Sequence, residues 1–199
     1  MFHIIIFVVI EMKKRLFIFD CFGVIFGEIG PRIVRKYAGH NDISELKDKL
    51  FVPADLGQIT YDELLTSIAD EFGVDKQTVA DDWNSFVVLN EELVEMIKVI
   101  RENACVALLS NASKGFVESL FEKFGLTHLF DKMVISCNVG MAKPDTKIYR
   151  YCVSLFDNDF DEIYMVDDNI ANVRAAAALG IIPIHFTGNE CVRELVDKF

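Results

Sequence analysis

The sequence is poor in positive charge. Its 199 residues carry 20 lysines and arginines against 31 aspartates and glutamates, giving a formal net charge of -11. Such an acidic surface repels nucleic acid and anionic membranes, so we expect neither as a partner. An anionic substrate must therefore meet positive charge that is concentrated at one place. The four histidines show no ligand spacing, which argues against a histidine-based zinc site.

Paired cysteine motifs are also missing. The five cysteines are odd in number and include no C-x-x-C pair, and most lie in apolar runs. Buried free thiols in a reducing compartment account for this pattern better than a disulfide framework or a zinc site. We therefore expect a cytoplasmic protein.

The apolar run at the N-terminus, Met1 to Ile10, is too short to span a bilayer. A signal peptide fits poorly because no basic segment precedes the run and no small-residue cleavage site follows it. Met12 begins a plausible start of its own. We expect residues 1–11 to be an N-terminal extension.

Five short apolar runs predict the strands of a sheet that is covered on both faces. Helical patterns separate the later runs, over Ser113–Phe124, Asp145–Phe156 and Asn169–Leu179. Because strands and helices alternate, we expect an α/β fold with a doubly wound parallel sheet. The predicted strands are Leu16–Phe19, Cys105–Leu109, Met133–Ser136, Ile163–Val166 and Ile181–His185.

Residues 27–90 break this rhythm and show helical patterns only. We expect a small all-helical cap domain here, inserted after the first strand of a core made of residues 12–26 and 91–199. Ligands of such sheets bind at the carboxyl ends of the strands, where the insert begins. A helical excursion without a role is the alternative. The predicted helices are Pro31–Tyr37, Ile43–Leu50, Tyr61–Phe72 and Lys76–Phe86, with Thr60 or Asp62 as the cap of the third, Asp75 as the cap of the fourth and Gly73 as a stop.

Aromatic side chains are frequent in this insert. We expect Phe51, Phe72, Trp83 and Phe86 to form its core rather than a platform on which substrate stacks.

Polar clusters follow the predicted strands, and parallel strands would bring them to one edge of the sheet. Asp20 closes the first strand, where a carboxylate can act as a covalent nucleophile. Ser110 and Asn111 end the second and can donate hydrogen bonds to an anion, helped by free N–H groups of a following helix. Taken singly, each has a plain structural explanation as a turn residue or a helix cap.

Two further clusters complete the set. Lys143 stands before Pro144, which opens a helix, and a lysine fixed there supplies positive charge to phosphate or to the nucleophile. Asp167 and Asp168 follow a buried strand, where adjacent carboxylates repel each other and need a cation. Their oxygen ligands suit magnesium. A surface lysine and an acidic helix N-terminus are the plain alternatives.

In this order and spacing, Asp20, Ser110-Asn111, Lys143-Pro144 and Asp167-Asp168 resemble the haloacid dehalogenase-like (HAD) superfamily. The stretch from Asp55 to Glu63 resembles a cap segment of its sugar-phosphatase and epoxide-hydrolase-linked phosphatase relatives. The resemblance implies a magnesium-dependent hydrolase of a small phosphate monoester, with a sugar phosphate among the candidates, acting through a phospho-Asp20 intermediate.

The resemblance also implies a role for each residue. Asp20 would be nucleophile and metal ligand, together with the backbone carbonyl of Phe22. Asp168 would bind magnesium directly and Asp167 through water. Ser110 and Asn111 would hold phosphate, Lys143 would neutralise phosphate and Asp20, and Asn172 would support the acidic loop.

Phe22 departs from the pattern, because phosphatases of the superfamily usually carry there the aspartate that protonates the leaving group. General acid–base catalysis contributes about 10²–10⁴-fold, so its loss should be felt. Three interpretations follow: a slow phosphatase, a 2-haloacid dehalogenase, or a catalytically weak regulatory or binding relative. Dehalogenases of the superfamily are metal-independent and lack the paired aspartates, so the phosphatase is favoured.

Overall fold

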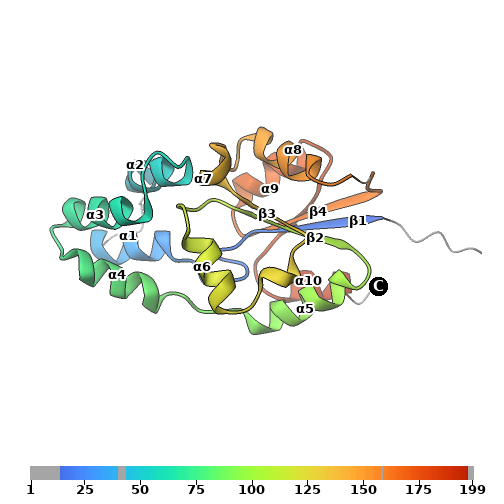
Figure 1. Cartoon of the computed structure of the whole chain (residues 1–199), viewed down its shortest axis with the longest axis horizontal. Coiled ribbons are helices and arrows are strands. Elements are labelled where there is room, and N and C mark those ends of the chain that lie inside the picture. The colour runs from blue at the N-terminus through green and yellow to red at the C-terminus, as the bar shows by residue number, and fades with distance from the viewer. Residues whose placement is uncertain (1–13, 40–43, 158, 197–199) are drawn as a thin grey trace, which may run out of the picture.

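A computed structural model describes residues 14–39, 44–157 and 159–196, so the predicted extension over residues 1–11 lies outside the described part (Figure 1). Within these ranges no helix combines the length and the apolar content that a bilayer crossing requires. In chain order the elements are β1 (Arg15–Phe19), α1 (Gly30–Ala38), α2 (Ser44–Asp55), α3 (Tyr61–Phe72), α4 (Lys76–Ser85), α5 (Glu91–Arg101), β2 (Cys105–Ser110), α6 (Phe116–Lys123), η1 (Thr127–Leu129), β3 (Lys132–Ile135), α7 (Ser136–Val139), α8 (Thr146–Ser154), β4 (Glu162–Asp167), α9 (Ile170–Ala177), β5 (Ile182–His185) and α10 (Glu190–Val196).

The strands form one parallel sheet in the order β3-β2-β1-β4-β5. This confirms the predicted α/β fold. The first strand of the chain lies in the middle, where Phe17 pairs with Val106 of β2 and Tyr164 of β4. The segments that follow β1, β2 and β4 are therefore neighbours although they are far apart in sequence.

Alternate side chains of β1 enter two apolar layers, which explains why the strand is apolar throughout. Phe17 and Phe19 pack in a large cluster with α5, α6 and α10, whereas Leu16 and Ile18 pack with α8 and α9 on the other face. Figure 1 shows α8 and α9 above the sheet and α5 and α10 below it. All four of these β1 side chains are fully buried, so the central strand is rigidly held.

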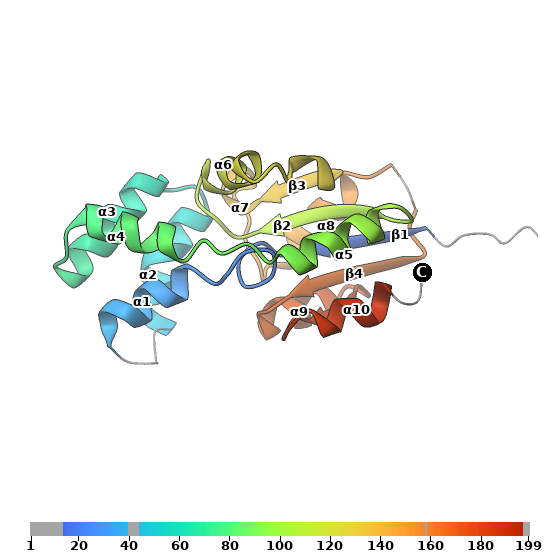
Figure 2. The same ribbon diagram turned by 90° about the horizontal axis from the view of Figure 1, so that it is seen from below.

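Helices α1 to α4 gather beyond the carboxyl ends of the strands, as Figure 2 shows. The connections to and from this helical group run side by side: Gly27 N–H donates to the Val88 carbonyl and Asn90 N–H to the Ile25 carbonyl, both at 2.9 Å. Phe26 and Leu89 form an antiparallel bridge between them. The group therefore leaves the core and returns at one place.

The predicted helix boundaries within the group hold where capping signals are strong. Thr60 and Glu63 form a capping box at the start of α3, and Gly73 ends that helix in a left-handed conformation. Asp75 caps α4 by accepting from the N–H groups of Gln77 and Thr78.

Other boundaries were wrong. Helix α2 runs past Pro53 to Asp55 rather than ending at Leu50, because Phe51 and Ala54 bury their side chains in the core. Tertiary packing thus overrides the local signal of proline. Helix α6 begins at Phe116 rather than Ser113, after Gly115 with φ of 80°. The segment before it is a loop.

Two strand expectations also need correction. Ser136 begins α7 rather than ending β3. Strand β5 is largely exposed instead of buried, with Ile182 37% exposed, because β5 is the edge strand beside β4. An apolar run alone does not distinguish an edge strand from a central one.

The cysteines of the described ranges are free thiols. Cys21 and Cys152 are buried as expected, whereas Cys105, Cys137 and Cys191 are partly exposed. Of the aromatic residues expected in the helical core, Phe51 and Trp83 are buried, while Phe72 and Phe86 are partly buried against the same cluster.

Candidate active site

The polar clusters meet at the carboxyl edge of the sheet. Asp20 directly follows β1, Asp167 ends β4 beside it, and Ser110 ends β2 on the other side. Lys143 comes from the loop between α7 and α8. The parallel order of β2, β1 and β4 thus brings together the residues that the sequence placed on separate strands.

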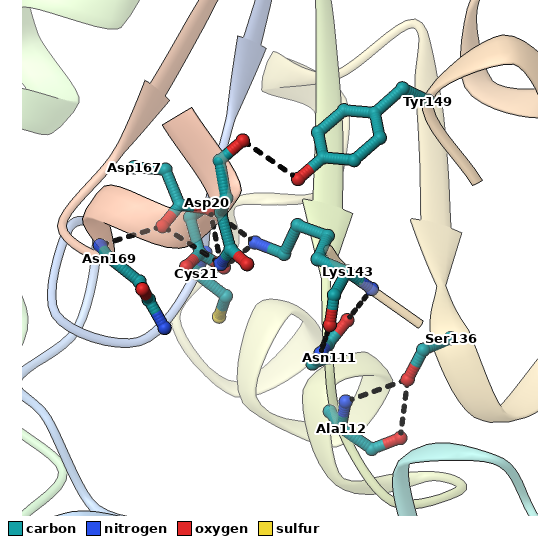
Figure 3. Close-up of polar contacts among 10 residues, drawn as sticks. Asp20, Cys21, Asn111, Ala112, Ser136, Lys143, Tyr149, Asp167 and Asn169 are labelled. Atoms are coloured by element: carbon teal, nitrogen blue, oxygen red, sulfur yellow. Dashed lines mark hydrogen bonds and ion pairs between the residues drawn. The ribbon is translucent and has the colours of Figure 1, made fainter. Parts of the chain in front are cut away.

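Lys143 joins two of the carboxylates. Its Nζ lies 2.8 Å from Oδ1 of Asp20 and 2.7 Å from Oδ2 of Asp167 (Figure 3). The lysine side chain is 1% exposed and that of Asp167 is fully buried. Breaking such a buried, charge-assisted network leaves an uncompensated charge, so its geometry is strongly maintained.

Burial and charge shift the proton affinities of these groups. Burial raises the pKa of Asp20 to about 8, with Asp167 adding to the effect and Lys143 opposing it. Burial alone would lower the pKa of Lys143, but the carboxylates of Asp20 and Asp167 outweigh it and raise that pKa. Lys143 is therefore a fixed positive charge beside the carboxylate of Asp20.

Three carboxylates converge here. Asp20, Asp167 and Asp168 each offer an oxygen within 4.8 Å of the others. In the described part of the chain, Lys143 is ion-paired with Asp20 and Asp167. Burial, followed by Asp167, raises the pKa of Asp168 to about 6. A magnesium ion fits this donor set, because it prefers oxygen ligands and would offset the excess negative charge.

The carboxylate oxygens of Asp167 already accept hydrogen bonds from other groups of the protein. Its Oδ1 accepts from the backbone N–H of Asn169 at 2.8 Å, and Asn172 Nδ2 lies 3.0 Å from both oxygens. With Lys143 also bound, few lone pairs remain for a metal ion. This suits a ligand that acts through water, and it places Asn172 in support of the acidic loop.

Asn111 holds the loop that carries Lys143. Its Nδ2 donates to the Lys143 carbonyl and its Oδ1 accepts from the Lys143 N–H, both at 2.8 Å. The amide thus fixes the lysine backbone, and one N–H of Nδ2 remains for an anion. The loop from Asn111 to Gly115 separates Asn111 from α6, so the helix starts three residues later in the chain than the predicted Ser113.

Ser110 is fully buried, and its hydroxyl has no hydrogen-bond partner in the described part of the chain.

Two residues that support the site were not predicted from the sequence. Ser136 Oγ accepts from the Ala112 N–H at 3.1 Å, and Tyr149 Oη donates to the Asn172 carbonyl at 3.0 Å (Figure 3). Both fix backbone beside the site, and neither belongs to a linear motif.

A family model for haloacid dehalogenase-like hydrolases matches residues 14–180, a range that includes Asp20, Ser110, Asn111, Lys143, Asp167 and Asp168. The chain belongs to this family. It is therefore a hydrolase of the HAD superfamily, as the strand-end clusters indicated.

Relatives of this HAD hydrolase include proteins named for phosphate chemistry. The chain is 25% identical to the sesquiterpene phosphatase astK of Aspergillus oryzae, over 85% of the chain and 88% of the relative. It is 30% identical to the drimenol cyclase drtB of Aspergillus calidoustus over 93% of its length. The chain spans only 36% of that cyclase.

Among solved structures, a HAD family enzyme from Bacteroides thetaiotaomicron in complex with magnesium and inorganic phosphate is similar in fold. The TM-score is 0.66 at 26% identity, covering 85% of this chain and 92% of that one. In our HAD hydrolase, the carboxylate cluster lies at the carboxyl edge of the sheet.

Phe22 provides no acid–base group to this HAD hydrolase. Its ring stacks on Phe116, with centroids 5.8 Å apart. A cavity of about 470 Å³ opens beside it, with Asp20, Lys143 and Asp168 among its lining residues and side chains from α2 to α4 opposite. This volume is within the usual range for small-molecule sites, about 300–1,000 Å³.

Sequence reasoning missed the charged residues that the helical group brings to the cavity, namely Glu28, Lys47, Asp48 and Asp55. Asp55 is notable because burial raises its pKa to about 7, against the opposing charges of Lys47 and Lys143. Only its place in the Asp55–Gly57 segment marked it beforehand. Gly57 lets this segment approach the core, since a Cβ there would lie 2.5 Å from the Cys137 carbonyl oxygen.

Proposed function

We propose that this protein is a magnesium-dependent hydrolase of a small phosphate monoester, acting through a phospho-Asp20 intermediate. The observation that carries the proposal is the bridge that Lys143 makes between Asp20 and Asp167 at the base of the cavity. Phosphoryl transfer needs positioning and charge neutralisation above all, and this arrangement supplies both. The phosphatase names among the relatives agree with it.

In the first half of the reaction, an oxygen of Asp20 attacks phosphorus and the bond from phosphorus to the ester oxygen breaks. Lys143 balances the charge of the nucleophile and the phosphoryl oxygens. Ser110 and Asn111 donate hydrogen bonds to those oxygens. Magnesium, held by Asp20, Asp168 and the Phe22 carbonyl directly and by Asp167 through water, would supply further positive charge.

The released alcohol needs a proton, which Phe22 cannot give. Asp55 lines the same cavity, and its pKa of about 7 suits a group that both gives and takes a proton near neutral pH. We assign it both transfers. It protonates the leaving oxygen, then accepts a proton from the water that attacks phospho-Asp20 and releases inorganic phosphate.

The helical group serves as the cap in this proposal. We assign residues 27–90 to the cap and residues 12–26 and 91–199 to the catalytic core. The cap residues that line the cavity would then contribute to the choice of substrate, since they meet the part of it that lies beyond the phosphate. The substrate is a small phosphorylated metabolite, with a sugar phosphate among the candidates, in a cytoplasmic setting that suits free thiols.

Two alternatives differ in chemistry. A 2-haloacid dehalogenase would need no proton for its leaving halide, which fits Phe22. Its reaction would not explain why the carboxylates of Asp167 and Asp168 are clustered, because it uses no metal ion. A regulatory or binding relative would keep the site geometry and lose turnover.

A substrate panel separates these functions. Purified protein is assayed with magnesium or EDTA on acetyl phosphate, a set of phosphate monoesters and 2-chloropropionate. We expect phosphate release that requires magnesium and that Asp20→Asn abolishes, with an unchanged circular dichroism spectrum. Halide release in EDTA would establish the dehalogenase instead. Absence of turnover on every phosphate, acetyl phosphate included, would establish the binding relative.

A further inference from the structure

The cavity wall beside the carboxylates is aromatic. Phe22 stacks on Phe116, Phe116 meets Trp83 edge-on with centroids 5.8 Å apart, and Trp83 lies 6.2 Å from Phe51. All four residues line the cavity. We call Phe22, Phe116, Trp83 and Phe51 the aromatic wall. It runs without interruption from the loop after β1, across α6, to the helices α4 and α2.

This wall begins at the nucleophile. Phe22 is two residues from Asp20 and lines the same cavity, so its ring is available to a group attached to phosphate at Asp20. Ile29 and Leu64 extend the apolar lining. Apolar surface removed from water on both sides favours an apolar group here.

The remaining charged residues of the cavity disfavour a second anionic group. Glu28, Asp48 and Asp55 line the cavity, and so does Lys47. Lys143 is already shared between Asp20 and Asp167. A bisphosphate or nucleotide would place its extra charge among acidic side chains, which repel it.

The indole nitrogen of Trp83 is enclosed by the protein. Trp83 is 5% exposed, and its Nε1–H has no acceptor within the ranges that the structure describes. Buried donors normally find a partner. Because this nitrogen has under 1 Å² of accessible surface, Trp83 presents carbon atoms rather than its N–H to a ligand in the cavity.

Given the phosphatase activity proposed above, we propose that the substrate is the monophosphate of a largely apolar, uncharged alcohol, whose hydrocarbon part lies along the aromatic wall. A sugar phosphate would leave its hydroxyl groups against Phe22 and Phe116 without hydrogen bonds, at a cost in affinity. Phe51 and Trp83, which the sequence predicted to form the core of the helical group, would therefore also contact the substrate.

Kinetics test the proposal, with geranyl monophosphate as the apolar probe and glucose 6-phosphate and fructose 1,6-bisphosphate as polar ones. We expect kcat/KM for geranyl monophosphate to exceed that for either sugar phosphate by about 100-fold or more, from the burial of its hydrocarbon chain. Equal or better turnover of the sugar phosphates would overturn the proposal. Acetyl phosphate reports the phosphatase itself, because it has almost nothing to place on the wall.

Binding gives a second test that needs no turnover. Trp83 is the only tryptophan of the chain, so its fluorescence reports on the aromatic wall. With magnesium present, we expect geranyl monophosphate to change the emission at concentrations where inorganic phosphate and glucose 6-phosphate do not. If this occurs but acetyl phosphate is not hydrolysed, the ligand class stands and the phosphatase proposal fails. An unchanged emission in a protein that hydrolyses acetyl phosphate would reject the ligand class.

A matched pair of variants locates the effect. Phe116→Leu should lower the ratio of kcat/KM for geranyl monophosphate to that for acetyl phosphate by about tenfold, through lost apolar contact. Phe124→Leu is the control, because this residue lies just beyond the same helix, packs on Phe26 and is absent from the cavity lining. An equal fall in the ratio for both variants would contradict a specific role of the wall.

Discussion

Gly23 and Asp168 lie so close that a Cβ atom on Gly23 would stand 2.5 Å from Cγ of the aspartate. Gly23 also has φ of 86°, a conformation that side chains rarely allow. Both the lack of room for a Cβ atom and the positive φ therefore require glycine at this position. The contact couples the loop after Asp20 to the acidic loop after β4, so one packing interaction sets the relative positions of the two parts of the proposed metal site.

Gly23→Ala should misplace the Asp168 carboxylate and leave the fold intact. We expect weaker magnesium binding, measured by calorimetric titration, and a loss of about 100-fold in kcat, since displacements of about 1 Å have such effects. Gly73→Ala is the control: Gly73 also has positive φ, but its surroundings are open. It should cost about 1 kcal/mol of stability and no activity. Equal kinetic losses in the two variants would show that strain, not the contact, is responsible.

Asp168→Asn should stabilise the metal-free protein, because three carboxylates cluster here and, among the residues that the structure describes, Lys143 is ion-paired with two of them. Removing one charge should raise the free energy of unfolding by about 1 kcal/mol. Magnesium at 100 times its Kd should add about 2.7 kcal/mol to the wild type and far less to the variant. Thermal unfolding with magnesium or EDTA measures both effects. Asp70→Asn, at an exposed position of α3, is the control and should change neither.

Lys143→Met should have the opposite effect on stability. It leaves Asp20 and Asp167 buried without their cation, which typically costs about 3–5 kcal/mol. Urea unfolding in EDTA measures this cost, and phosphatase activity should be lost as well. Lys147→Met removes a lysine that is 76% exposed and should change stability by under about 0.5 kcal/mol. A small cost for Lys143→Met would mean that the bridge contributes little.

Asp55→Asn should remove the pH dependence of alkyl phosphate turnover near pH 7. Asp55 donates its proton to the leaving group only when protonated, so wild-type turnover of an alkyl phosphate should fall as the pH rises through about 7. The variant should lose about 100-fold in the rate at which such substrates phosphorylate Asp20. Acetyl phosphate, whose leaving group needs no proton, should keep that first step and be slowed only in the hydrolysis of phospho-Asp20. Asp48→Asn, at another lining residue, should keep the wild-type pH profile. A preserved alkaline fall in Asp55→Asn would assign the proton transfer to another group.

The same carboxyl affects stability with a definite sign. Its pKa is raised from 3.8 to about 7 in the folded state, so the native protein binds more protons than the unfolded chain between these values. The free energy of unfolding should therefore fall as the pH rises through this window. Asp55→Asn should reduce this slope, as urea titrations at several pH values would show.

Much of the core follows from local patterns in the sequence. Apolar runs such as Leu16–Phe19 predicted strands because a sheet covered on both faces needs apolar residues at every position. Asp20 and the Asp167–Asp168 pair could be placed together because parallel strands end at one edge. Strong caps such as Thr60 fixed helix boundaries to the residue.

What the sequence could not provide depends on packing between distant segments. The hydrogen bonds of Asn111 to the Lys143 backbone join residues 32 positions apart, and nothing local distinguishes them from phosphate contacts. Likewise, Asp55 and Trp83 reach the cavity only because the helical group lies over the sheet edge. The exposure of β5 depends on its place at the sheet edge, which an apolar run does not encode.

The paired connections at Gly27–Val88 and Ile25–Asn90 have a further consequence. The chain leaves and rejoins the core at one point, so the helical group is a long insertion whose two ends lie together. The entropic cost of bringing these ends together grows only slowly with the length of the insertion. A helical group of different size could be exchanged there without disturbing β1 or Asp20. The fold thus lets descendants of one ancestor change what they recognise while they inherit the same chemistry.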